Sequence, residues 1–411
     1  MTRNLKSFHS EPVGEKISGV LFLNKLDGSQ NPIDWYLSKI AGVPFALRNL
    51  ITFQRVNIED LAIFIEDPEG DLEGLFSTIL NDSRISKNIV WLGNILQLKK
   101  WIQSNPNQVY IFNGSALHDK RKLNELINSH SQNTNELQTQ FPINPENLES
   151  FLLGLFTPGS NISSEKPQAG FPIYVQGSKK AEIQKPEDFQ TLHELQVKGS
   201  GLNHDSLITR ICSRPASRLL TRAFLNTPIS PNQITCISFF LGLASAFFFF
   251  QGAYGANVVA ATLLVFSIWV DGADGEIARL KFMETDTGKK LDIYGDNIVH
   301  FLVFTAIGVG IFNKTGETIY LYLGGLAGLG GLTAFFLLSP ILLKKRSPAK
   351  ELFHISESGL EEKFANRDFV HFLFLVSLID HLQIFILIAA IGANVFAGFL
   401  IYSRFCKLKT A

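Results

Sequence analysis

Four aspartates stand in two closely spaced pairs within one segment of the chain, DGADGEIARLKFMETDTGKKLDIYGD. Asp271 and Asp274 are three residues apart. Asp292 and Asp296 are four apart, so each pair would share one face of a helix. Carboxylates brought together repel one another unless cations offset their charge. Because hard divalent ions such as Mg²⁺ or Mn²⁺ prefer oxygen ligands and attract phosphate groups, the segment predicts a metal site that acts on a diphosphate.

The residues between the two pairs are suited to a phosphorylated ligand. Gly275, Ala278 and Gly288 are small, which would let a nucleotide approach the backbone closely. Arg279 offers a planar guanidinium that can bind two phosphate oxygens at once. The segment therefore combines metal ligands, small residues and a phosphate-binding cation.

Together these residues read Asp271-x2-Asp274-Gly275-x2-Ala278-Arg279-x8-Gly288-x3-Asp292-x3-Asp296, which resembles the signature of the CDP-alcohol phosphotransferase (CDP-alcohol phosphatidyltransferase) family at every fixed position. A signature with this many fixed residues is specific, unlike a lone glycine motif. The resemblance covers roughly residues 205–411. It extends to Pro231-Asn232-Gln233-Ile234-Thr235, which is similar to the Pro-Asn-x-x-Thr start of the family's first span.

The resemblance implies a role for each aspartate. Asp271, Asp274 and Asp292 would hold two metal ions, Mg²⁺ or Mn²⁺, that neutralise the diphosphate of a CDP-alcohol, with Asp296 also near the metals. Asp296 would be the general base that takes the proton from the acceptor hydroxyl as it attacks the β-phosphorus and expels CMP.

The resemblance also implies a substrate pocket around the metals. Its expected lining, with Arg279 on the phosphate, is Gly275, Ala278, Arg279, Gly288, Asn232 and Thr235. Asn and Thr after a proline are equally ordinary helix-start residues, which is the alternative for the last two. Asn297 and His300 either face the same cavity or serve packing.

The second half of the chain is dominated by apolar runs that can each supply most of a membrane-spanning helix of about 20 residues. The six runs are 233–251, 256–270, 298–312, 319–343, 369–379 and 384–402. We therefore expect an all-α polytopic membrane domain with six transmembrane helices in contact with lipid. The aspartates lie between the second and third runs.

Lys and Arg collect on one side of these runs, which is typical of the cytoplasmic side. That side holds Arg279, Lys281, Lys289, Lys290, Lys344, Lys345, Arg346, Lys350, Arg404, Lys407 and Lys409. The opposite short loops hold Lys314. No apolar core follows the first charged residues, so no cleaved secretory signal is expected. The distribution predicts a multi-pass protein of the cytoplasmic membrane, with the active site and the N-terminal domain on the cytoplasmic side.

Small residues recur at spacings of four in the fourth run. Gly324 with Gly328, and Ala327 with Gly331, would let another helix approach closely. That helix belongs either to a second copy, which would make the protein a homodimer, or to the same chain.

Residues 196–229 join the two halves and carry an arginine every four residues: Arg210, Arg214, Arg218 and Arg222. On a helix these form one basic stripe, which favours an interfacial helix on anionic headgroups; a solvated charged face is the alternative. Pro215 places the helix start near itself. With the family resemblance, Arg214, Arg218 or Arg222 would also bind the phosphate of an acceptor.

The first half, 1–195, alternates strand-like runs (VLFL, LAIFI, IVWLG, VYIFNG) with helical patterns. This predicts an α/β domain, Rossmann-like, with a mostly parallel sheet. Its segments LSKIAGVPFALRNLITFQRVNIEDLAIFI and AEIQKPEDFQTLHEL resemble sugar-nucleotidyltransferases. The fusion resembles the bifunctional inositol-1-phosphate cytidylyltransferase/di-myo-inositol phosphodiester synthases.

This half departs from the nucleotidyltransferase pattern at three places. Its first loop lacks Gly-x-Gly-x-Arg and has Trp35 near the expected catalytic lysine. Ser115 and Gln184 stand where metal-binding aspartates are expected. Because the phosphate loop and the metal ligands are lost together, we expect a degenerate, nucleotidyltransferase-like domain without catalysis.

The overall composition sets few further bounds. With 37 basic and 37 acidic residues the chain has no net pull toward nucleic acid, and three scattered cysteines do not make a disulfide framework. We therefore expect an integral membrane transferase in phospholipid or inositol phosphodiester synthesis. It would move a phosphatidyl or phosphoalcohol group from a CDP-alcohol (CDP-diacylglycerol or a CDP-polyol) to an alcohol or polyol-phosphate acceptor. A bifunctional enzyme with added cytidylyltransferase activity and a non-catalytic scaffold are the alternatives.

Overall fold

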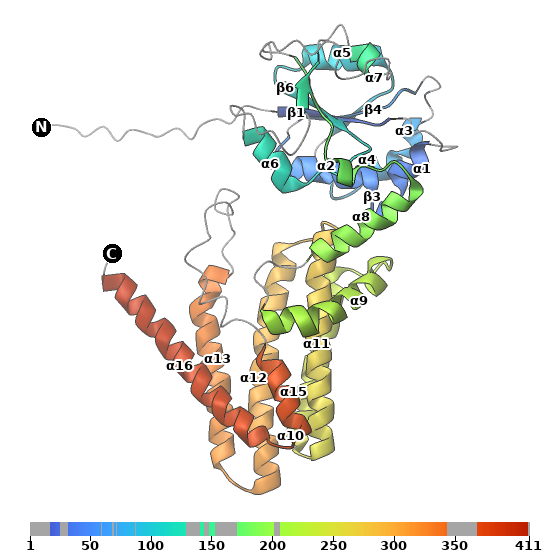
Figure 1. Cartoon of the computed structure of the whole chain (residues 1–411). Helices are drawn as coiled ribbons and strands as arrows, with labels where there is room; N and C mark the ends of the chain where they lie inside the picture. The colour runs from blue at the N-terminus through green and yellow to red at the C-terminus, as the bar shows by residue number, and fades with distance from the viewer. Residues whose placement is uncertain are drawn as a thin grey trace, which may run out of the picture. The chain divides into compact units, whose positions relative to one another are not determined.

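The computed structural model describes residues 17–24, 32–58, 60–67, 70, 72–86, 88–128, 140–143, 148–152, 171–200, 206–342 and 368–409. The chain divides into two compact units, Met1–Gln196 and Val197–Ala411. Figure 1 shows a sheet with helices in the first unit and a helical bundle in the second.

The first unit is built on a six-stranded sheet with the order β5-β4-β1-β6-β8-β7. All neighbouring strands are parallel except the pair β7–β8. The strands are β1 Ile17–Phe22, β4 Asp60–Phe64, β5 Ile89–Leu92, β6 Gln108–Asn113, β7 Gln140–Pro142 and β8 Ile173–Val175. A separate hairpin pairs β2 Lys39–Ile40 with β3 Val43–Pro44. The predicted α/β unit with a mostly parallel sheet is confirmed.

Helices cover both faces of this sheet, as a parallel sheet requires. The central strand β1 is buried along its whole length, and all of its residues except Ser18 are apolar or glycine. Helices α5 and α7 lie over one face, and α2 and α6 lie over the other (Figure 1). The helices of the unit are α1 Pro32–Leu37, α2 Phe45–Arg55, α3 Leu72–Leu75, α4 Ser77–Leu80, α5 Ile95–Ser104, α6 Lys120–Asn128 and α7 Leu148–Leu152, with a 3₁₀ turn η1 Lys179–Ala181. Helix α8 Pro186–Gly199 begins in the first unit, and its last three residues belong to the second.

Five helices of the second unit are long and apolar enough to cross a membrane: α10 Pro231–Gln251, α11 Tyr254–Leu280, α12 Asp286–Thr315, α13 Ile319–Leu342 and α16 Leu382–Lys409. The six predicted spans are not confirmed among the described residues. The run 369–379 forms α15 Phe369–Leu378, a helix of 10 residues. At 1.5 Å per residue it extends about 15 Å, roughly half of a bilayer's apolar core. A turn with Asp380 at φ 57 ends it, and α16 begins immediately afterwards.

The ends of the long helices follow from local sequence. Ser230 caps α10 in a reciprocal pair with Gln233, and Pro231 is the first helical residue. Gly252 ends this helix at φ 73, a conformation that suits glycine, and its Cα lies against Gly310 of α12. Thr285 caps α12 by accepting a hydrogen bond from the Gly288 amide. These caps place the starts of α10 and α12 at defined positions beside the end of α11.

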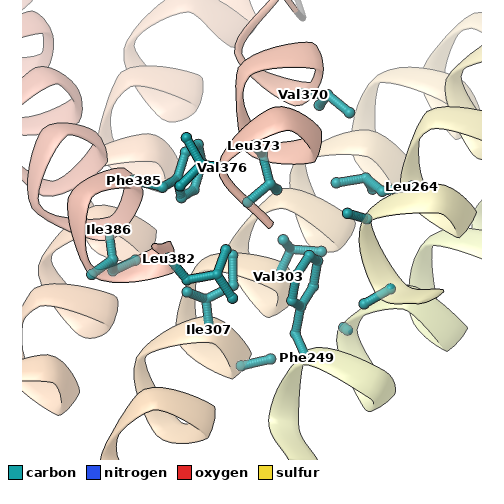
Figure 2. Packing of buried hydrophobic residues seen from close by; sticks show 14 of the residues in the cluster. Phe249, Leu264, Val303, Ile307, Val370, Leu373, Val376, Leu382, Phe385 and Ile386 are labelled. Atoms are coloured by element: carbon teal, nitrogen blue, oxygen red, sulfur yellow. The ribbon is translucent and has the colours of Figure 1, made fainter. Parts of the chain in front are cut away.

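The helices share a large apolar cluster. In Figure 2, side chains of α10, α11, α12, α15 and α16 converge between the ribbons, among them Phe249, Leu264 and Val303. Helix α15 contributes Val370, Leu373 and Val376, so the short helix completes this core even though it is too short to be a span by itself.

Small residues bring α12 and α13 together. An added Cβ on Gly324 would lie 2.9 Å from the Cα of Gly308, and one on Gly328 would lie 2.9 Å from the Phe301 ring. This pair of glycines therefore serves close packing within the chain. The homodimer stays a prediction.

Candidate active site

Three of the four aspartates form a cluster at the junction of α11 and α12. Asp271 and Asp274 come from the end of α11, and Asp292 comes from the start of α12. Each offers one carboxylate oxygen, and these oxygens lie within 4.8 Å of one another. Asp274 is only 7% exposed. A set of three carboxylate oxygens suits a hard divalent ion, which would offset their mutual repulsion. The cluster can therefore hold a metal ion.

Asp296 lies one helical turn beyond Asp292 and lines the same cavity as the cluster. The walls of that cavity are Thr235, Ser238, Phe239, Leu264, Ser267, Ile268, Asp271, Asp292, Gly295, Asp296, Val299 and His300. The fourth aspartate thus borders the space in front of the metal ligands. His300 lies one further turn along α12 and packs edge-on against Phe369, with ring centroids 5.1 Å apart.

The start of α10 contacts the carboxylates. The hydroxyl of Thr235 donates a hydrogen bond to Asp274, and the Ser238 hydroxyl lies 3.5 Å from Oδ1 of Asp271. Hydrogen bonds of this kind fix the orientation of metal-binding carboxylates. The Pro-Asn-x-x-Thr segment, singled out in the sequence, is therefore brought to the aspartates by the capped start of α10.

Gly288 allows α10 and α12 to meet at this end of the bundle. A Cβ at this position would lie 2.6 Å from Oδ1 of Asn232 and 2.9 Å from Oγ1 of Thr285. No larger residue fits without moving one of them. Asn232 and Gly288 are thus direct neighbours, which the sequence resemblance alone did not specify.

Arg279 lies on α11 close to the small residues of the signature. A Cβ on Gly275 would be 3.3 Å from its Nη1, and Ala278 is half-buried beside it. The Nε of Arg279 donates a hydrogen bond of 2.9 Å to the carbonyl of Ser200. The backbone at Ser200 therefore orients one edge of the Arg279 guanidinium.

The basic stripe divides into buried and exposed arginines. It lies on the π-helical turn η2 Thr209–Ser213 and on α9 Arg214–Leu225. Arg214 is buried and forms a 2.8 Å ion pair with Glu276 of α11. Arg218 donates to the Lys198 carbonyl at 3.2 Å, whereas Arg222 is exposed. The three predicted phosphate ligands thus stand in three different environments.

Glu276 is the residue that sequence reasoning missed. It is fully buried, and its second oxygen accepts a 2.8 Å hydrogen bond from the Thr221 hydroxyl. An ionisable residue within an apolar helix is by itself a signal of function, and Glu276 directly follows Gly275 of the signature. That signal was available in the sequence.

The first unit has amides and aromatic rings where nucleotidyltransferase ligands were expected. Ser115 donates to Oδ1 of Asn113 at 2.7 Å, and Gln184 lies 3.4 Å from Glu182. Trp35 packs edge-on against Phe189, with ring centroids 5.8 Å apart. Throughout the described parts of the chain, the one group of three metal-ligating side chains is the aspartate cluster of the second unit.

Residues 228–397 match the sequence model of the CDP-alcohol phosphatidyltransferase family, and all four aspartates lie inside this match. The C-terminal part of the chain is a CDP-alcohol phosphatidyltransferase domain. The family resemblance predicted from the spacing of the aspartates is confirmed for this part of the chain.

Curated relatives are similar to this chain over about a third of its length. A protein of Archaeoglobus fulgidus named "Bifunctional IPC transferase and DIPP synthase" is 35% identical over 152 residues, which is 36% of this chain and 29% of that protein. Proteins with the same name from Aquifex aeolicus and Rubrobacter xylanophilus are 31% and 28% identical, over 31% and 33% of this chain. These matches span 29% and 30% of the two relatives, so each covers less than a third of the relative's length.

Proposed function

We propose that the protein is an integral membrane transferase that moves a phosphatidyl or phosphoalcohol group from a CDP-alcohol to an acceptor hydroxyl and releases CMP. The observation that carries this proposal is the convergence of three carboxylates, with Asp296 beside them, inside the CDP-alcohol phosphatidyltransferase domain. Metal-assisted transfer of a phosphate group needs this combination of metal ligands and a nearby base.

Each aspartate has a distinct part in the proposed reaction. Asp271, Asp274 and Asp292 would hold two Mg²⁺ or Mn²⁺ ions, whose charge neutralises the donor's diphosphate. Asp296 accepts the proton of the acceptor hydroxyl while the oxygen of that hydroxyl bonds to the β-phosphorus. The bond from this phosphorus to the oxygen of CMP breaks, and CMP leaves with that electron pair.

The residues around the aspartates would bind and orient the donor. Gly275, Ala278 and Gly288 would let the nucleotide approach the backbone, and Gly288 also lets Asn232 lie against α12, since a Cβ there would be 2.6 Å from its Oδ1. Arg279 would bind the diphosphate with the guanidinium edge that Ser200 does not occupy. Thr235 holds Asp274 in place, since its hydroxyl is bonded to that carboxylate.

The chemistry of the relatives guides the choice of substrate. Three of them are named IPC transferase and DIPP synthase, which supports an inositol-type polyol phosphate as one substrate. CDP-diacylglycerol and a CDP-polyol are both compatible with the signature as donors. The product assay below separates them.

The distribution of charge supports a place in the cytoplasmic membrane with the site on the cytoplasmic side. Arg279, Lys289 and Lys290 flank the site, whereas Lys314 lies at the far end of α12. We further propose a homodimer and the domain division 1–195, 196–229 and 230–411. The first domain would be a non-catalytic relative of nucleotidyltransferases, because amides surround Glu182 where acidic metal ligands would be needed.

The test is a metal-supplemented assay of the protein in membranes, with CDP-diacylglycerol or CDP-inositol as donor, a panel of acceptors, and mass spectrometry of the products. We expect metal-dependent CMP release that Asp296→Asn abolishes. If no donor is consumed with any acceptor, the proposed function is wrong. Turnover of CTP with a polyol phosphate by the Asp296→Asn protein would instead support the bifunctional alternative.

A further inference from the structure

Glu276 holds two side chains of α9 from inside the bundle. Oε1 accepts a hydrogen bond from Nη1 of Arg214, and Oε2 accepts one from the Thr221 hydroxyl; the donor and acceptor atoms are 2.8 Å apart in both. Glu276 is completely buried, and Arg214 is 8% exposed. A buried carboxylate is tolerated only when it is paired and hydrogen-bonded, and both conditions are met here. The pair therefore fixes which turn of α9 faces α11.

The contact lies on the side of α11 that turns away from the aspartate cluster. Gly272 and Glu276 are one turn apart, and a Cβ on Gly272 would be 3.2 Å from the Cβ of Ser217 on α9. Asp271 and Asp274 occupy another face of the same helix, toward α10 and α12. The same two turns of α11 thus carry the metal ligands on one face and α9 on another.

A second set of hydrogen bonds connects α9 to Arg279, the arginine of the family signature. Arg218 of α9 donates to the carbonyl of Lys198 at 3.2 Å. Two residues later, the carbonyl of Ser200 accepts the 2.9 Å bond from Nε of Arg279. A closed path therefore runs from Glu276 to α9, from α9 to residues 198–200, and from there to Arg279 on α11.

We infer that Glu276 is a positioning residue for donor binding: by fixing α9, it fixes the carbonyl that orients Arg279 toward the diphosphate. This inference rests on the proposed function. It assigns Arg214 to the positioning of α9, since its charge is already matched by Glu276. Recognition of an acceptor phosphate then falls to exposed cations such as Arg222.

Glu276→Gln tests the inference, because it removes the charge and keeps the size. A guanidinium whose orientation is lost binds phosphate less well, so we expect the KM for the CDP-alcohol to rise about tenfold or more. The KM for the acceptor and the apparent affinity for Mg²⁺ should stay near the wild-type values. Glu276→Asp, which keeps the charge on a shorter arm, should lie between the wild type and Glu276→Gln.

Arg218→Met provides a second variant at a less buried position. It detaches residues 198–200 from α9 without leaving a charge unpaired, so it too should raise the donor KM. If Arg218 bound an acceptor phosphate instead, the acceptor KM would rise. Asp380→Asn is the matched control, because it breaks the 2.6 Å pair with Lys314 at the other end of α12. It should change neither KM.

The outcomes separate this inference from the proposed function. A wild-type protein that releases no CMP overturns both. An active wild type whose donor KM is unchanged in Glu276→Gln or in Arg218→Met overturns the inference alone, and the pair is then a purely structural contact. If Glu276→Gln does not fold, the result with Arg218→Met decides.

Discussion

Thr235 on α10 donates its hydroxyl hydrogen to the carboxylate of Asp274 on α11, across 39 residues of sequence. Both side chains are 7% exposed, so water does not replace this bond easily. The first long helix of the membrane unit therefore has a direct part in orienting a metal ligand. That part can be tested separately from the metal ligands themselves.

Thr235→Val keeps the shape of the side chain and removes the hydroxyl. We expect the apparent affinity for Mn²⁺ to fall by about tenfold or more, as is typical when a partner of a metal ligand is lost. Titration of Mn²⁺ followed by electron paramagnetic resonance measures this affinity directly. Thr235→Ser, which keeps the hydroxyl, should bind the ion nearly as well as the wild type; equal loss in both variants would contradict the role of the bond.

The four aspartates should separate into two classes. Asp271→Asn, Asp274→Asn and Asp292→Asn remove a ligand, so each should weaken Mn²⁺ binding and CMP release together. Asp296→Asn should retain most of the Mn²⁺ affinity and lose turnover by about a hundredfold or more, since it removes the base. Binding and rate are measured on the same purified protein. If Asp296→Asn lost as much Mn²⁺ affinity as the other three variants, Asp296 would be mainly a metal ligand rather than the base.

Gly288→Ala should impair donor binding through a steric clash. The new Cβ would lie 2.6 Å from Oδ1 of Asn232, so α12 or the amide must move. We expect the KM for the CDP-alcohol to rise about tenfold, on the order of the effect of a small displacement in a binding site. Gly255→Ala is the control, because no atom lies within 4 Å of a Cβ there among the described residues. Adding Asn232→Ala to Gly288→Ala should relieve the clash with the amide, while the 2.9 Å approach to Oγ1 of Thr285 remains, so the donor KM should recover only in part.

His118 makes the stability of the first unit depend on pH. Its ring is buried, and this burial lowers its pKa from 6.5 to about 4, although Nε2 lies 2.9 Å from the Asn113 carbonyl. The unfolded chain binds the proton first, so the stabilising contribution is complete above pH 6.5 and is lost as the pH falls toward 4. The full effect is on the order of 3 kcal/mol.

This dependence is measured by unfolding the whole protein with denaturant in detergent at several pH values. Hydrogen exchange of the amides in the first unit reports the stability of that unit at each pH. His118→Gln keeps a donor for the Asn113 carbonyl and cannot titrate. It should flatten the loss of stability between pH 6.5 and 4. An unchanged slope would mean that other groups carry the acid sensitivity.

The metal site was predictable because its ligands are close in the sequence. The spacing within each aspartate pair fixes one helical face, and the short connection between α11 and α12 brings the two pairs together. Strand runs buried on both faces likewise indicated the parallel sheet.

Features that depend on distant partners were not predictable. The burial of Arg214 depends on Glu276, 62 residues away, and no local pattern pairs them. The length of α15 depends on a turn at Asp380 with positive φ, which an apolar run of 11 residues does not reveal. Hydropathy counts apolar residues but does not show where a helix stops.

The order of the elements has a consequence for how the protein is made. The four aspartates of the site, and Thr235, which orients Asp274, all precede α13, whereas the core in Figure 2 draws on α15 and α16. Chains emerge from the ribosome N-terminus first, so α10, α11 and α12 enter the bilayer before the rest of the bundle exists. The ligand set is thus complete early in synthesis, and a divalent ion bound at that stage would hold α11 and α12 together, with α10 attached through Thr235, until the later helices arrive.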